Sequence, residues 1–153
     1  MWTRSKSRIV ALATVFGLAL LAPLSATASP PEPVTIAMHG VLTGPDSVAG
    51  TFTVSGAFSD AGTYVETYRF AGNTIHGVKT LSGSYGTITL VVQAVVRWTS
   101  PTRAELFAGQ WRLESGTGAY ANVHGEGSPG ATGSADLAAG TVDVLHEGLA
   151  SVN

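Results

Sequence analysis

The chain contains no cysteine among its 153 residues. It therefore cannot form a disulfide, a cysteine-ligated zinc site or a cysteine nucleophile, and no cysteine can carry a lipid anchor. A domain without disulfides must be stabilised by the apolar surface that it buries.

Basic residues are also few, with eight Lys and Arg against ten Asp and Glu. Three of the eight lie within residues 1–8, so the rest of the chain carries five basic residues against ten acidic ones. Nucleic acids and anionic membranes attract basic patches. The acidic balance therefore argues against both as partners.

Motifs for catalysis and metal binding are missing as well. No G-x-S-x-G sequence occurs, and the glycine-flanked Ser82 and Ser84 are typical of a turn, which argues against a serine hydrolase. His124 and Glu126 would share one face of a strand, but two ligands are too few for a structural metal site. We predict no metal and no cofactor.

The N-terminus has the three-part layout of a secretory signal peptide. Residues 1–8 are basic, residues 9–21 are apolar, and a small A-T-A sequence ends at Ala28. The alternative, a transmembrane anchor, needs about 20 apolar residues, and this run is shorter. We therefore predict a signal peptide over residues 1–28 with cleavage after Ala28, a secreted, extracellular product and no stable membrane anchor.

After the signal peptide, the sequence lacks helical periodicity. Residues 29–33 form a Pro-rich, extended leader, and residues 34–153 contain short alternating runs separated by glycine or polar residues. The expected strands are 34–42, 50–58, 63–71, 73–81, 86–98, 103–113, 119–127 and 135–149. We take residues 34–153 as one domain.

Short strands without intervening helices predict an all-β fold. The fold we favour is an eight-stranded antiparallel β-barrel, and a β-sandwich is the alternative. Closure of a barrel removes exposed strand edges, which suits an exported protein without disulfides. The glycines within strands are expected at tight bends of such a barrel; they are Gly40, Gly56, Gly77, Gly109 and Gly125.

The stretch GTGAYA, residues 116–121, matches the pattern G-x-G-x-x-A of dinucleotide-binding loops. That function requires a helix after the loop, whose N-terminus receives the phosphates. The residues that follow are rich in glycine, include a proline and lack a helical period. We interpret the stretch as a turn between strands, in which Gly116 or Gly118 supplies a positive φ.

The longer run GQWRLESGTGAYANVHGEG, residues 109–127, resembles a pattern in the allene oxide cyclase and dirigent-like barrel superfamily. The matching positions are Gly109, Trp111, Gly116, Thr117, Gly118, Tyr120, Gly125 and Gly127. The resemblance implies an eight-stranded antiparallel barrel with an apolar cavity, and plant relatives that assemble as trimers suggest a homo-oligomer. It implies no catalytic residue, because no catalytic motif of the plant enzymes can be placed on this sequence.

Alternation along the strands also indicates which residues face inward. The side chains expected to line a ligand-binding cavity are Phe52, Val54, Tyr64, Tyr68, Leu90, Val92 and Trp98.

Glu66 lies between Tyr64 and Tyr68 on one face of its strand. If this face points inward, the carboxylate is desolvated among aromatic rings and becomes a candidate general acid or anchoring group. If it points outward, Glu66 is solvated. We favour the solvated alternative, because Thr67 and Arg69 make the opposite face equally polar.

Three functions are compatible with these features. The first is the binding of an apolar or amphipathic small molecule without catalysis. The second is a cyclase or isomerase that uses the cavity, with Glu66 as the candidate catalytic residue. The third is a structural or interaction scaffold that forms a homo-oligomer.

Overall fold

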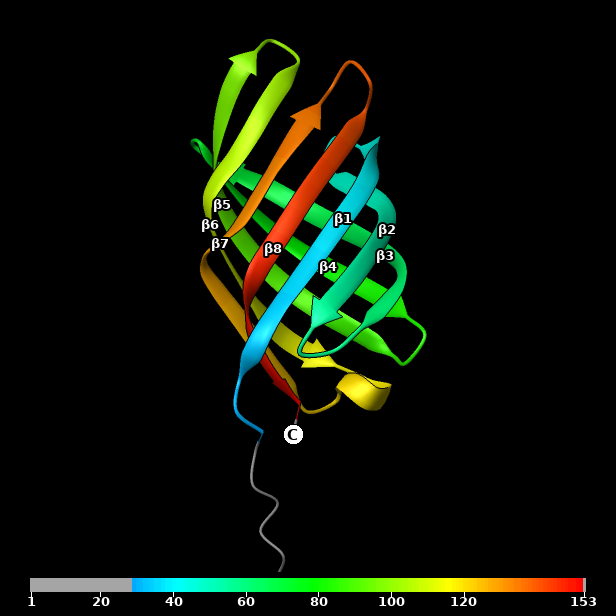
Figure 1. Cartoon of the computed structure of the whole chain (residues 1–153). Coiled ribbons are helices and arrows are strands. Elements are labelled where there is room, and N and C mark those ends of the chain that lie inside the picture. Colours follow the sequence, from blue (N-terminus) through cyan, green and yellow to red (C-terminus); the bar gives the residue numbers. More distant parts are fainter. Residues whose placement is uncertain (1–28, 153) are drawn as a thin grey trace, which may run out of the picture.

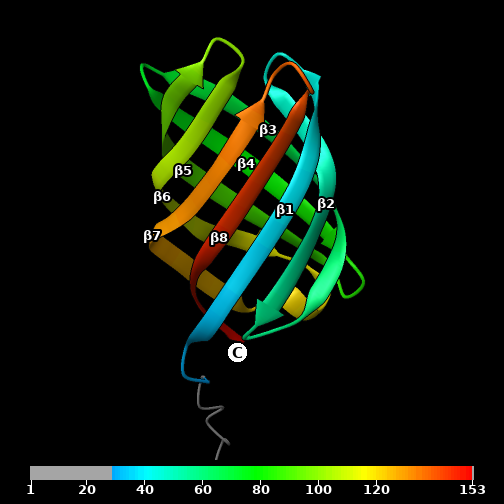
Figure 2. The same ribbon diagram turned by 45° about the horizontal axis from the view of Figure 1, so that its top comes forward.

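A computed structural model describes residues 29–152, and the predicted signal peptide lies outside these residues. The described chain is a closed antiparallel barrel of eight strands (Figures 1 and 2). The strands are β1 (Glu32–Gly44), β2 (Ser47–Gly56), β3 (Asp60–Ala71), β4 (Thr74–Gly83), β5 (Thr87–Ser100), β6 (Arg103–Gly116), β7 (Val123–Asp136) and β8 (Thr141–Val152). A single turn of 3-10 helix, η1 (Gly118–Tyr120), joins β6 to β7.

Each strand pairs with its neighbours in the chain, and β1 pairs with β8 to close the barrel. The expected barrel is therefore confirmed, and the sandwich alternative is wrong. The predicted leader is shorter than residues 29–33, because Glu32 and Pro33 already pair with β8. No helix within residues 29–152 is long and apolar enough to cross a membrane.

The seventh and eighth strands differ from the sequence prediction. The expected strand 119–127 begins in η1, and β7 continues to Asp136 through a stretch that is rich in glycine and includes one proline. These glycines permit close strand contact, since a Cβ on Gly127 or on Gly130 would lie 2.1 or 2.2 Å from the carbonyl oxygen of Glu147. The stretch is therefore a tightly packed strand with an irregular register, and β8 begins only at Thr141.

The run of residues 109–127, which carries the resemblance to the barrel superfamily, has a packing role in the structure. Trp111 is buried, and its indole Nε1 donates a hydrogen bond of 2.9 Å to the carbonyl oxygen of Glu147. A Cβ on Gly127 or on Gly148 would lie within 2.8 Å of the indole ring. The tryptophan therefore crosses β7 and β8 at positions where glycine leaves room for it.

The GTGAYA stretch closes the barrel at the end where both described chain ends lie (Figure 1). Gly118 has a φ of 61°, the positive value expected for this turn. Tyr120 points into the barrel, and its hydroxyl donates a hydrogen bond of 2.6 Å to the carboxylate of Asp60. The backbone amides of Ser84 and Ala61 donate to the same carboxylate. The loop is thus a structural closure, followed by a strand.

Several buried side chains fill the half of the barrel nearer to this closure. They include Val34, Ile36, Phe52, Val54, Tyr64, Leu81, Ile88, Leu90, Trp111 and Tyr120. The hollow space lies toward the opposite end.

Candidate functional site

The opposite half of the barrel contains an apolar cavity of about 70 Å³. Its walls come from inward positions on strands all around the barrel, among them Val92, Ala94, Val142 and Val144. The β1–β2, β3–β4, β5–β6 and β7–β8 hairpins form the other end of the barrel (Figure 2). The cavity extends to this end, because Leu42, Phe70, Trp98 and Leu137 beside the hairpins belong to its lining. Three apolar side chains at this mouth are about half exposed: Phe70 by 52%, Trp98 by 53% and Leu137 by 42%.

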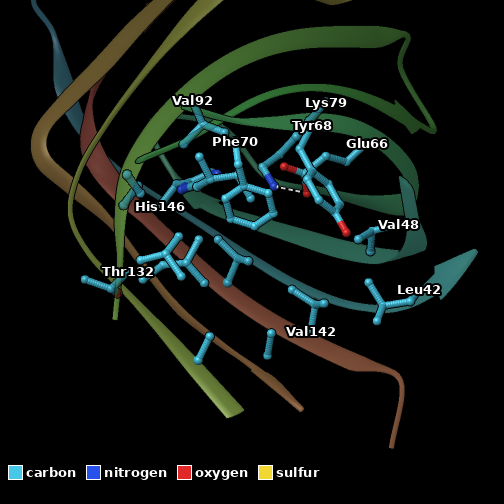
Figure 3. A pocket seen from close by; sticks show the side chains of 18 of the residues that line it. Leu42, Val48, Glu66, Tyr68, Phe70, Lys79, Val92, Thr132, Val142 and His146 are labelled. Carbon is cyan, nitrogen blue, oxygen red and sulfur yellow. Dashed lines mark hydrogen bonds and ion pairs between the residues drawn. The ribbon is translucent and has the colours of Figure 1, made fainter. Parts of the chain in front are cut away.

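A buried ion pair lies at the inner end of the cavity (Figure 3). The Lys79 ammonium group donates to the Glu66 carboxylate, and only 2% and 6% of these side chains are exposed. The two residues stand directly opposite each other on β4 and β3. Gly77 makes room for the carboxylate, because a Cβ there would lie 2.4 Å from Oε1 of Glu66.

Burial lowers the pKa of Lys79, and the charge of Glu66 acts in the opposite direction. Two opposite charges removed from water together largely compensate each other, whereas either one alone would be costly. The pair therefore gives the cavity floor strong polarity without a net charge.

His146 completes the floor from β8. It is fully buried and stacks on Trp111, with ring centroids 6.0 Å apart and an angle of 24° between the planes. Within residues 29–152, its Nδ1 and Nε2 have no hydrogen-bond partner. Burial, and then the nearby charge of Lys79, lower the pKa of His146 to about 3, against a smaller opposing effect of the Leu145 backbone. The imidazole is therefore neutral at pH 7, with one unused donor and one unused acceptor.

Tyr64 lies beside the ion pair on the packed side. The Lys79 Nζ atom is 5.7 Å from the centroid of its ring. Its hydroxyl is also buried without a hydrogen-bond partner among the described residues. Burial, followed by the negative charge of Glu66, raises the pKa of Tyr64.

The structure divides the residues predicted to line a cavity into two groups. Tyr68, Val92 and Trp98 line the cavity. Phe52, Val54, Tyr64 and Leu90 are buried in the packed core, outside the cavity lining.

The solvated position that we favoured for Glu66 is wrong, because the side chain is 94% buried and lines the cavity. Glu66 can be buried because Lys79 compensates its charge and Gly77 leaves space for its carboxylate. Neither feature can be predicted from the polarity of β3 alone.

Sequence reasoning missed Lys79 and His146, although both left a signal. The two-residue turn Gly72-Asn73 places Ala71 opposite Thr74, and the same register places Glu66 opposite Lys79. His146 continues the alternation of Val142 and Val144 on the inner face of β8.

No group of three or more His, Asp or Glu residues gathers as a metal site within residues 29–152. Neither the family models, nor the curated proteins, nor the solved structures with which the chain was compared gave a match. The resemblance to the allene oxide cyclase and dirigent-like superfamily stays a prediction.

Proposed function

We propose that this barrel is a secreted protein that binds one small amphipathic molecule in its cavity. The observation that carries the proposal is the combination of apolar walls, an apolar mouth and a polar floor with unused hydrogen-bonding groups. Ligand sites are typically apolar clefts with a few convergent polar groups, and barrels of this size hold at most one small ligand.

The volume limits the ligand. A cavity of about 70 Å³ is well below the roughly 300–1,000 Å³ of sites that enclose drug-sized molecules. The ligand is therefore either very small or inserts one end only. In the second case its remaining apolar part lies against Phe70, Trp98 and Leu137 at the mouth.

Filling the cavity tests the proposal. Ala94 is buried on the cavity wall, whereas Ala37 is exposed on the outer face of β1. Native mass spectrometry and solvent extraction of purified protein should find a bound compound in wild type and in the control Ala37→Leu, and not in Ala94→Leu. A wild-type barrel without any compound, or one that keeps it in Ala94→Leu, would contradict the proposal.

A cyclase or isomerase is the second candidate, because the buried Glu66–Lys79 pair places ionisable groups in an apolar cavity. Conversion of the ligand would require these groups, whereas binding alone would not. The compound recovered from Glu66→Gln would then differ chemically from the one recovered from wild type. Recovery of the same compound from both proteins would favour binding without catalysis.

A further inference from the structure

We infer that the ligand enters with its polar end first and that this end is a hydroxyl group bound by His146. The inference rests on the proposed function, and it specifies the chemical class of the ligand as an alcohol with an apolar body.

The first argument is the unpaired imidazole. His146 is fully buried and lines the cavity, and neither ring nitrogen has a hydrogen-bond partner among residues 29–152 (Figure 3). A buried polar group without a hydrogen bond is costly, and protein interiors therefore rarely leave one unpaired. On an inner face otherwise built from Val142 and Val144, an apolar residue would avoid this cost. The partner of the imidazole must therefore come from the cavity.

The second argument concerns charge. Glu66 and Lys79 already compensate each other at the floor. A carboxylate or an ammonium group on the ligand would add a buried charge with no free counterion among the residues that line the cavity, which is strongly unfavourable. A neutral ligand group avoids this penalty.

The third argument is complementarity. A neutral imidazole offers one N–H donor and one acceptor nitrogen. A hydroxyl group can either donate to the free nitrogen or accept from the N–H, whereas a ketone or an aldehyde can only accept. The ammonium group of Lys79 has N–H donors beyond the one directed at Glu66, and these can donate to the hydroxyl oxygen.

The walls then determine the orientation. Beyond the floor the cavity is lined by aliphatic side chains such as Ala94, Val96 and Val142, and its mouth by Phe70 and Trp98. A polar end at the mouth and an apolar end at the floor would leave His146 unpaired. The reverse orientation pairs one ring nitrogen of His146 with the hydroxyl group and places the apolar part of the ligand against the aliphatic walls.

Three probes with the same hexyl chain test the inference: 1-hexanol, heptanoate and hexylammonium. Isothermal titration calorimetry at pH 7 should give an affinity for 1-hexanol at least tenfold higher than for either ion. In ¹⁵N-detected spectra of the imidazole rings, 1-hexanol should shift the resonances of His146. The resonances of the exposed His124 should stay in place.

Variants separate recognition by His146 from general apolar binding. His146→Phe should lower the affinity for 1-hexanol at least tenfold, and the matched surface control His124→Phe should not change it. The spectra of wild type provide the same test if His146→Phe does not fold.

Two kinds of failure are distinguishable. If the three probes bind equally well, or if 1-hexanol binds without shifting the His146 resonances, the inference is wrong while the proposed function stands. If no probe binds to wild type and native mass spectrometry finds no bound compound, the proposed function fails and the inference fails with it.

Discussion

At the scale of single residues, His146 lowers the stability of the fold and at the same time offers hydrogen-bonding groups to a ligand. Its two unpaired nitrogens lower the stability of the folded protein, because an unsatisfied buried polar group costs about 1–3 kcal/mol. Such a cost is understandable where the group serves binding, since stability and function often oppose each other at binding sites.

Replacement of His146 by phenylalanine tests this cost. The ring can still stack on Trp111, and the adjacent cavity accommodates its slightly larger size. The free energy of unfolding at pH 7 should therefore increase by about 1–2 kcal/mol. Urea unfolding measures this free energy. A decrease in stability would indicate that the ring nitrogens of His146 form hydrogen bonds in solution.

His146 should also make stability depend on pH. Its pKa is about 3 in the folded protein against 6.5 for the unfolded chain. Between these values only the unfolded chain binds the proton, so the stability present above pH 6.5 is lost as the pH falls, by about 1.4 kcal/mol per unit. Urea unfolding from pH 7 to 4.5 should show this slope in wild type.

The control for this slope is His146→Phe. The other charged groups of the cavity, Glu66 and Lys79, are the same in both proteins. The difference between the two slopes therefore reports on His146, and equal slopes would contradict the prediction.

The Glu66–Lys79 pair gives a third residue-scale prediction. Glu66→Gln or Lys79→Met alone leaves one buried charge without its partner and should cost about 3–5 kcal/mol of unfolding free energy. The double variant removes both charges and should cost clearly less than the sum. Additive losses in a double-mutant cycle would show that the two groups do not interact strongly.

At the scale of strands and turns, the sequence predicts the first six strands well. Their alternation places Ile36, Phe52 and Tyr64 on inner faces, and the structure buries them. It fails for β7, because the glycines of that strand serve close contacts with β8 that single-strand alternation does not encode. For the site, the sequence singles out Glu66 but does not predict whether its side chain points into the barrel or outward. The inward position depends on Lys79, which lies opposite Glu66 across the β3–β4 hairpin.

Gly77 links strand packing to the site. An alanine Cβ there would lie 2.4 Å from Oε1 of Glu66 and would displace the carboxylate from Lys79. Gly77→Ala should therefore destabilise wild type by about 1–3 kcal/mol. Chemical denaturation measures the loss, which should be smaller in a Glu66→Ala background, where the clash with the carboxylate is absent and only the close contact with Val92 remains. An equal loss in both backgrounds would assign the effect to the strand itself.

At the scale of the whole molecule, the sequence leaves barrel and sandwich open because both have the same alternation. Closure depends on the pairing of β1 with β8, whose paired residues lie at least 100 positions apart in the sequence. His39 and Asp143, for example, are joined by a side-chain hydrogen bond of 2.6 Å. Local patterns do not report such long-range pairing.

Export is the remaining prediction at this scale. Residues 1–153 produced in a secreting host should give protein outside the cells with Ser29 as its first residue, as intact mass spectrometry would show. Ala28→Arg replaces the small residue that cleavage requires and should block processing. Secreted protein that retains residues 1–28 would contradict the prediction.

Both ends of the described chain lie at the closed end of the barrel, and the four hairpins of the mouth lie at the other (Figure 1). A sensor chip or bead coupled through either end therefore holds the barrel with its opening toward the liquid. Immobilisation in this orientation keeps Phe70, Trp98 and Leu137 accessible to molecules flowing past the surface.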